Sequence, residues 1–236
     1  MRKSQQGFTL IEIAIVLVII GLLLGGVLKG QELIQNARVR NIIAQQDGIK
    51  AAFFGFQDRY RGIPGDYLAT SATTNIPGAG AASCGGDGNS LIDHVVNGVA
   101  ESICAWYHLS HAGFISGNYS GIGATSSAAN ANATNSPTNA FGGVMQLNFD
   151  NDYADGTTLA AGTASPVHNI KTGTNIPATV LAEIDRKIDD GLPTSGNFRF
   201  SDWQGSTPST CVNTGVTPYA WAITSNATQC GGVSLF

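Results

Sequence analysis

The longest apolar stretch of the chain lies near its start and runs from Phe8 to Leu28 without a Lys, Arg or His. A helix needs about 20 apolar residues to cross a bilayer. Arg2 and Lys3 precede the stretch, and basic residues in this position stay on the cytoplasmic side of a membrane. The pattern therefore predicts a membrane-spanning helix that leaves the N-terminus in the cytoplasm and the rest of the chain across the membrane.

Helical spacing of apolar residues continues beyond this stretch. The residues of the second stripe follow one another at intervals of three and four: Val39, Ile42, Gln46, Ile49, Phe53, Phe56 and Tyr60. Gln46 is its single polar member, and Gly62 and Pro64 then favour the end of the helix. One helix is thus expected from Phe8 to about Tyr60, on the order of 80 Å long at the rise of an α-helix.

Shorter elements follow the long helix. Two segments have the pattern of short helices, and three have that of strands: Glu101–Phe114 and Pro177–Asp190, then Gly143–Phe149, Asn197–Trp203 and Tyr219–Thr224. The expected fold class is α+β. A long N-terminal helix, transmembrane in its first half, packs against a globular head that holds short helices and a small antiparallel sheet.

Two segments of the head are expected at its surface. Residues Gly117–Asn139 are rich in Ser, Ala, Asn and Gly, which predicts an exposed, mobile loop. Asp185, Asp189 and Asp190 lie beside two basic residues on the second short helix, which favours a solvated face.

Composition narrows the function classes. Charged residues make up 12% of the chain, below the roughly 25% usual for globular proteins. The formal net charge of −4 gives no general basic surface, so nucleic acid is not an expected partner. The sequence contains no Gly-x-Ser-x-Gly elbow, P-loop or His-Glu-x-x-His motif, so we expect a protein that is not an enzyme.

All four cysteines lie beyond the apolar stretch, at Cys84, Cys104, Cys211 and Cys230. An even number of cysteines outside the cytoplasm predicts two disulfides, for which three pairings are possible. We favour Cys84–Cys104 and Cys211–Cys230, because neighbours in sequence close the smaller loops.

Glu12 is the one charged residue inside the apolar stretch. A carboxylate within the hydrocarbon of a bilayer costs roughly 2.5–3.5 kcal/mol on insertion scales. A residue in such a position usually has a function and a partner, and the stretch itself holds no cationic side chain.

The segment Gln6-Gly7-Phe8-Thr9-Leu10-Ile11-Glu12, preceded by a short basic leader, resembles the prepilin signature of type IV pilins and type II secretion pseudopilins. The resemblance implies cleavage by prepilin peptidase between Gly7 and Phe8 and N-methylation of Phe8. It divides the chain into a leader (1–7), a transmembrane and assembly segment (8–28), an amphipathic continuation of the helix (29–61) and a head (62–236).

Cleavage at this position would place a new α-amine beside the carboxylate. Phe8 and Glu12 are four residues apart, so they are neighbours on one face of a helix. The amine of Phe8 is expected to form a salt bridge with Glu12 of its own chain or of the next subunit, which would set the axial register of the helices. The leader prevents this pairing, because the amide that it forms carries no charge.

The resemblance also implies partners and a location. The expected partners are prepilin peptidase, other pilin or pseudopilin subunits, an inner-membrane assembly platform and membrane lipid. Before assembly the chain would cross the inner membrane once, and afterwards it would belong to a periplasmic pseudopilus or an extracellular pilus. The alternative function is a membrane-anchored periplasmic binding or adhesive domain that uses a pilin-type anchor.

Two acidic turns resemble parts of a calcium-binding loop. The side chains concerned are Asp150, Asp152 and Asp155 in one turn and Asp87, Asn89 and Asp93 in the other. Neither turn has the full EF-hand spacing or its bidentate Glu, so solvated turn carboxylates are the competing interpretation. Some pseudopilins bind calcium, and the resemblance extends that hypothesis to this chain. No other cofactor is indicated.

Cys104, His108 and His111 are spaced so that they share one face of the first short helix, which would suit zinc ligands. The competing interpretation is a disulfide cysteine beside two histidines on a partly polar face.

Overall fold

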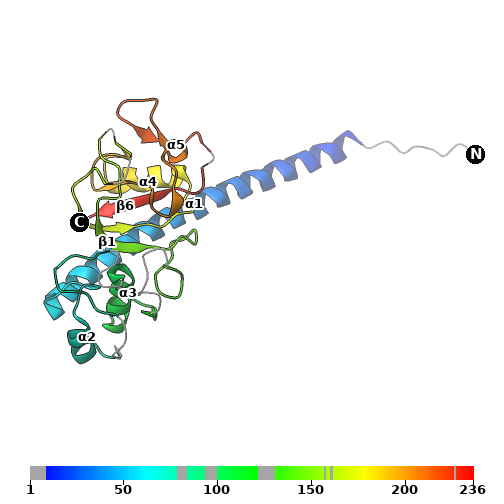
Figure 1. Cartoon of the computed structure of the whole chain (residues 1–236). Coiled ribbons are helices and arrows are strands. Elements are labelled where there is room, and N and C mark those ends of the chain that lie inside the picture. The colour runs from blue at the N-terminus through cyan, green and yellow to red at the C-terminus, as the bar shows by residue number, and fades with distance from the viewer. Residues whose placement is uncertain are drawn as a thin grey trace, which may run out of the picture. The chain divides into compact units, whose positions relative to one another are not determined.

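The structure, a computed structural model, describes residues 9–78, 84–93, 100–121, 131–156, 158–159, 162–225 and 227–236. The chain divides into two compact units, Met1–Arg38 and Val39–Phe236. Helix α1, Leu10–Tyr60, is a single uninterrupted helix that contributes to both units (Figure 1). Its expected start at Phe8 lies outside the described residues, and its end at Tyr60 is confirmed.

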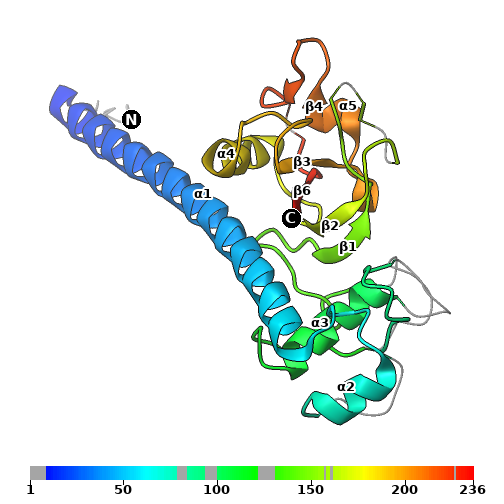
Figure 2. The same ribbon diagram turned by 90° about the vertical axis from the view of Figure 1, so that its left-hand side faces the viewer.

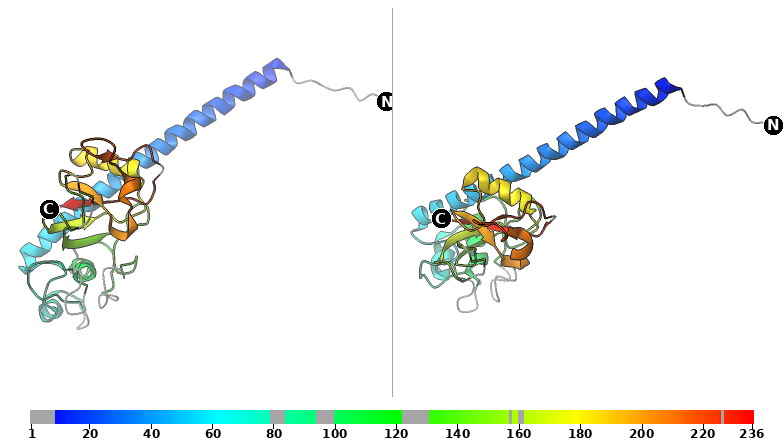
Figure 3. Two further views of the ribbon diagram at one scale, coloured as in Figure 1. Left: turned by 45° about the horizontal axis from the view of Figure 1, so that its top comes forward. Right: turned by 90° about the horizontal axis from the view of Figure 1, so that it is seen from above.

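In the first unit, α1 carries apolar side chains on all its faces. Every large apolar residue from Leu10 to Leu28 is exposed, and the helix continues without a break through this region (Figure 3). Among the described residues, α1 is the one helix that is long and apolar enough to cross a membrane, judged by length and composition.

In the second unit, only one stripe of α1 is apolar and buried. Its buried residues are Val39, Ile42, Gln46, Ile49, Ala52, Phe53 and Phe56. The stripe expected from the spacing is therefore confirmed, with Tyr60 half-buried at its end and Ala52 as an additional member. A hydrophobic surface on one face of a helix needs a partner to cover it, and the head supplies two.

The head covers this stripe with two hydrophobic clusters. Val39 and Ile42 belong to the first, together with helix α4, Ala178–Ile188, and strand β3, Phe198–Ser201. The second cluster joins Ile49, Phe53 and Phe56 of α1 to helix α3, Glu101–His111, and to the main sheet. Trp106 and Leu109 of α3 and Leu147 and Ile170 of the sheet take part. Helix α3 accordingly lies by the end of α1 that precedes the turn at Gly62, and α4 lies further back along the helix (Figure 2).

The main sheet is antiparallel throughout and has the order β1-β2-β6-β3. Its strands are β1, Gln146–Asp150, β2, Val167–Lys171, β6, Gly231–Leu235, and β3. A second, two-stranded sheet pairs β4, Val212–Asn213, with β5, Ala220–Trp221. The other helical elements are α2, Ala69–Asn75, α3, Glu101–His111, the short 3-10 helix η2, Trp203–Gly205, and α5, Pro208–Cys211. The fold class is α+β, as expected.

Both expected disulfides are confirmed, Cys84–Cys104 and Cys211–Cys230. Each lies among buried apolar residues. Cys211 and Cys230 belong to the cluster around α4, while Cys84 and Cys104 form a smaller cluster with Ala100 and Ile103.

The three expected strands correspond to β1, β3 and β5, and both expected short helices are present as α3 and α4, with boundaries shifted by a few residues. Strands β2, β4 and β6 and the short helices α2, η2 and α5 were not expected from the sequence. Strand β6 contains Gly231 and Gly232, a pair that sequence patterns associate with turns. The ring of Phe198 lies so close to Gly232 that a Cβ there would come within 2.5 Å of it. Glycine is therefore needed here for close packing inside a strand.

The expectation that Gly117–Asn139 is an exposed loop is wrong for part of the segment. Residues 122–130 lie outside the described residues, but Asn135, Ser136 and Asn139 are buried. The amide nitrogen of Asn139 donates hydrogen bonds to the carbonyl oxygens of Thr172, at 2.8 Å, and Thr174, at 3.1 Å. Polar side chains are buried here because they satisfy backbone groups of a neighbouring segment.

Replacing Phe56 by Ala should lower the free energy of unfolding by about 3–5 kcal/mol, because Phe56 is fully buried between α1 and α3. Phe54→Ala is the matched control. Phe54 lies on the same helix and is 52% exposed, so its loss should cost about 1 kcal/mol or less. Urea unfolding of both variants in detergent measures the difference, and equal losses would contradict the assignment of the buried stripe.

Candidate functional site

Thr9 and Glu12 close the first turn of α1 with reciprocal hydrogen bonds. The backbone N–H of Thr9 donates to Oε2 of Glu12 at 2.8 Å, and the Thr9 hydroxyl donates to the same oxygen at 2.7 Å. In return, the N–H of Glu12 donates to Oγ1 of Thr9 at 3.4 Å. This arrangement is a capping box, which satisfies N–H groups that the first turn of a helix leaves open. It also places a negative charge at the positive end of the helix dipole.

The capping role of Glu12 was not expected from the sequence, where this residue was expected to act in assembly. The signal was available, since Thr-x-x-Glu ahead of an apolar run is the pattern of a capping box. Gly7 and Phe8 lie outside the described residues, so cleavage between them and methylation of Phe8 stay predictions. Thr9 directly follows Phe8, and an α-amine created there would therefore adjoin the cap.

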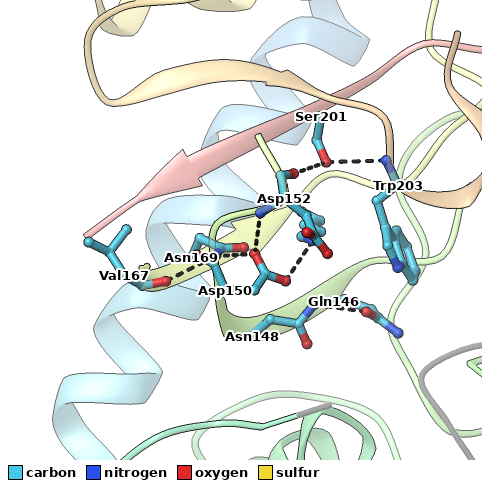
Figure 4. Close-up of polar contacts among 9 residues, drawn as sticks. Gln146, Asn148, Asp150, Asp152, Val167, Asn169, Ser201 and Trp203 are labelled. Carbon is cyan, nitrogen blue, oxygen red and sulfur yellow. Dashed lines mark hydrogen bonds and ion pairs between the residues drawn. The ribbon is translucent and has the colours of Figure 1, made fainter. Parts of the chain in front are cut away.

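Asp150, at the end of β1, forms a buried ion pair with Lys171, at the end of β2 (Figure 4). The Nζ atom of Lys171 lies 2.7 Å from Oδ2 of Asp150 and 3.6 Å from Oδ2 of Asp152. Asp155 instead pairs with Arg199, whose NH1 nitrogen is 2.6 Å from its Oδ1. Cationic side chains thus lie beside all three candidate calcium ligands and would compete with a metal ion. The calcium hypothesis for this turn stays a prediction.

Glu101, the first residue of α3, is a buried carboxylate that organises the segment after Cys84. Its Oε1 accepts a hydrogen bond from the N–H of Asp87 at 3.3 Å, and its Oε2 accepts one from the N–H of Asp93 at 2.8 Å. Burial raises the pKa of Glu101 from its ordinary 4.5 to about 7. The negative charges of Asp66 and Asp93 add to this effect, and the two N–H donors oppose it.

Asp66 holds the same segment from the other side. Its Oδ1 accepts from the N–H of Gly88 and its Oδ2 from the N–H of Ser90, both at 2.6 Å. Gly86 lies between the Asp66 backbone and the Glu101 carboxylate, and a Cβ at that position would come within 2.4 Å of both. The two buried acids therefore fix the backbone of this segment through its N–H groups.

Asp66, Asp87 and Glu101 also form a group whose ligand atoms lie within 4.8 Å of one another, close enough to hold a cation. Asp87 was among the expected calcium ligands of this turn, whereas Asp66 and Glu101 were not. Neither is adjacent in sequence to the acidic turn, and only the fold brings them to it. Calcium in this turn also stays a prediction.

Residues 2–28 match the family model described as "Prokaryotic N-terminal methylation motif". This stretch is the prepilin-type cleavage and methylation signal of type IV pilins and pseudopilins. The matched signal supports a type IV pilin-like or pseudopilin precursor. No curated protein and no solved structure matches it.

This one signal covers both features at the N-terminus of the chain, the apolar part of α1 and the capping box. The matched residues end at Leu28, where the apolar stretch of the sequence also ends, and they include Thr9 and Glu12 of the capping box. The motif implies processing by prepilin peptidase and assembly with other pilin subunits. It describes a structural pilin-type segment and no enzyme class.

The zinc hypothesis on α3 gives way to its alternative, because Cys104 is bonded to Cys84. His108 is fully buried, and its Nδ1 accepts a hydrogen bond from the N–H of Gly65 at 2.9 Å, so its proton is on Nε2. Burial lowers the pKa of His108 from 6.5 to about 4. The histidine thus serves as a neutral acceptor that ties the turn after α1 to α3.

Asp185 on α4 is buried, and the expectation of a solvated face is wrong for this residue. Its Oδ2 accepts from Nε1 of Trp221 at 2.7 Å, and its Oδ1 accepts from the N–H of Gly191 at 3.2 Å. Burial, helped by the nearby charges of Asp190 and Asp189, raises the pKa of Asp185 from 3.8 to about 7, against the opposing effect of the two N–H donors. The indole N–H of Trp221 is the reason that a carboxyl can occupy this position.

Replacing Asp185 by Asn should change stability in a pH-dependent way. The folded chain keeps the Asp185 proton up to about pH 7, whereas the unfolded chain releases it near pH 4, so this carboxyl reduces stability as pH rises between the two values. The free energy of unfolding of the variant relative to wild type should therefore increase from pH 4 to 7, by on the order of 3 kcal/mol.

Glu101→Gln should show the same trend, and the two effects should add because the carboxyls share no hydrogen-bond partner. The quantity to compare is the free energy of unfolding of each variant minus that of wild type. In wild type alone, His108 with its lowered pKa makes the fold more stable as pH rises from about 4 to 6.5, which would mask the effect of the carboxyls. Denaturant titrations across this range provide the data. A difference that stayed constant with pH would show that these carboxyls are charged throughout.

Proposed function

We propose that this chain is a structural subunit of a type IV pilus or a type II secretion pseudopilus, which is inserted in the inner membrane and then assembled through its first helix. The carrying observation is the prepilin signal at residues 2–28, which coincides with a helix whose apolar residues are exposed on every side. Residues Val39–Phe236, which include the second part of α1, form a separate compact unit with two large hydrophobic clusters.

The exposed apolar segment from Leu10 to Leu28 requires an apolar surrounding both in the precursor and in the assembled filament. Fourteen large apolar residues between Leu10 and Leu28 are exposed, more apolar surface than soluble monomers leave open. Lipid would cover this surface in the precursor. Helices of other subunits would cover it in a filament, where close packing replaces the lipid contacts.

Glu12 would link cleavage to assembly. In the precursor, its carboxylate is held by Thr9, and the residue before Thr9 has no free amine because the leader is attached. Cleavage after Gly7 would create a cation at Phe8, and the charged pair would be stable in a low-dielectric bundle only if amine and carboxylate meet. The inner-membrane platform would then extract processed subunits from the lipid.

The alternative, a membrane-anchored binding or adhesive domain, would share the anchor but would have no requirement for Glu12. Assembly behaviour of Glu12 variants therefore separates the two functions.

The mature protein should begin at Phe8 and carry an N-methyl group, because the prepilin signal places the junction after Gly7. N-terminal sequencing and the mass of the N-terminal peptide from native membranes would establish this. A mature chain that still begins at Met1 would contradict processing as a prepilin.

Glu12→Gln should preserve membrane insertion and cleavage but reduce incorporation into filaments. Glutamine can still complete the capping box, so the variant removes the charge and keeps the helix start. The unpaired Phe8 amine in the helix bundle would cost about 3–5 kcal/mol. The measurement is the ratio of sheared filament to membrane-bound protein, with processing followed by gel mobility.

Glu32→Gln is the matched control, since Glu32 lies on the same helix and is exposed, paired with Lys29 at 2.8 Å. It should assemble like wild type. If Glu12→Gln assembled equally well as the sole subunit, the chain would be better described as an anchored domain.

A further inference from the structure

One face of the β1–β2 pair is polar and nevertheless buried. The register places Gln146 opposite Lys171 and Asn148 opposite Asn169, on the same face as Asp150. None of these five residues is more than 8% exposed, and Lys171 is 1% exposed. An ammonium and a carboxylate withdrawn from water are costly even when paired. Packing of the sheet alone therefore does not explain why Lys171 and Asp150 are buried.

The carboxyl of Asp150 contacts an amine through one oxygen and two N–H donors, from Asn169 and Asp152, through the other (Figure 4). Its Oδ2 is 2.7 Å from Nζ of Lys171. Its Oδ1 accepts two hydrogen bonds, from Nδ2 of Asn169 at 2.9 Å and from the N–H of Asp152 at 3.2 Å. Two N–H donors on one oxygen stabilise the negative charge that develops there in acyl transfer. The Asp152 carboxylate lies 3.6 Å from the same Nζ and is one-third exposed.

We propose that Lys171 and Asp150 condense to form an intramolecular isopeptide bond between β1 and β2. The Lys171 ammonium first transfers one proton to Oδ2 of Asp150, along the hydrogen bond that joins them. The resulting amine attacks Cγ of Asp150, and the N–H groups of Asn169 and Asp152 hold Oδ1 in the tetrahedral intermediate. The C–Oδ2 bond then breaks, and Oδ2 leaves as water. The Asp152 carboxylate accepts a proton from Nζ and returns it to the departing oxygen.

The reaction balances without a co-reactant. One ammonium and one carboxylate become one amide and one water, and no electrons are transferred. Holding the two groups in contact supplies the high effective concentration that an intramolecular reaction needs. The product replaces a buried charged pair by a neutral amide, which removes the cost of burying both charges.

The surroundings favour condensation over a hydrated ion pair. Lys171 faces Val233 across the β2–β6 pair, and Val233 forms a small apolar cluster with Tyr153 and Ala164. The ring of Trp203 lies 6.0 Å from Nζ. Burial raises the pKa of the nearby Asp202, which shows that this region disfavours charged groups.

The bond would give the main sheet a covalent link between two neighbouring strands, in addition to the two disulfides. Unlike the disulfides, it would survive reduction. The proposal concerns the head alone and holds whether or not the chain assembles into a filament.

The test is mass spectrometry of the full-length protein purified from membranes, reduced and alkylated. The segment containing both residues should be lighter than its sequence by one water, and digestion on both sides of each strand should yield a branched peptide joining Lys171 to Asp150. Trypsin should also fail to cleave after Lys171 in the denatured protein. An unmodified mass with cleavage after Lys171 would overturn the proposal.

Lys187 supplies an internal control. It forms an ion pair with Glu183 at 2.5 Å, but both side chains are about one-third exposed to solvent. Trypsin should therefore cleave after Lys187 in the same sample. If the Lys187–Glu183 pair lost water as well as the Lys171–Asp150 pair, the loss would be a chemical artefact of preparation. That result would overturn the proposal that the surroundings of Lys171 and Asp150 promote the reaction.

Asp152→Asn tests the proposed proton transfer. The variant keeps the backbone N–H that holds Oδ1 but lacks the basic carboxylate, so condensation should be slower by at least about 100-fold. The fraction condensed is measured in protein collected at successive times after induction, and the disulfides report folding. Condensation at the wild-type rate would overturn the role of Asp152, whereas folded, uncondensed protein would support it.

Discussion

Burial of the stripe on α1 from Val39 to Phe56 organises the head, because both large hydrophobic clusters include residues of this stripe. Without α1, the cluster around α4 and the cluster around α3 would each expose an apolar face. The same helix has no such stripe before Arg38, where its apolar side chains are exposed on all sides. One continuous backbone thus serves two apolar surroundings, the interior of the head and, on the proposed function, lipid or neighbouring helices.

The head also depends on polar groups that are buried with defined partners. Glu101 and Asp66 accept N–H groups from the segment after Cys84, Asp185 accepts the indole N–H of Trp221, and Lys171 pairs with Asp150. Each of these groups would destabilise the fold if it were left alone. Together they position irregular segments that have little apolar surface of their own, which fits a chain that is poor in charged residues and rich in glycine.

At the N-terminus, a capping box and a processing signal occupy the same residues. In the unprocessed chain, Thr9 and Glu12 satisfy N–H groups of the first turn of α1. The carboxylate of Glu12 therefore has hydrogen-bond partners before cleavage. Cleavage after Gly7 would add a cation beside a carboxylate that is already oriented. The cap therefore gives a physical reason why a glutamate can be tolerated near the start of an apolar helix.

Local patterns in the sequence were sufficient for the features that depend on near neighbours. The spacing of Val39 to Phe56 determined the buried stripe, the apolar run determined the exposed segment, and the residues around Gly7 determined the family of the signal. The disulfides followed from the shortest loops.

Other features required the tertiary structure, because their partners are distant in the chain. Strand β6 was hidden by glycines that make room for Phe198, and β2 by polar residues on a buried face. Asp66 approaches Glu101, and Lys171 approaches Asp150, only after the strands and loops have been brought together. A charged residue looks the same in sequence whether water or a buried partner surrounds it, and only packing decides which.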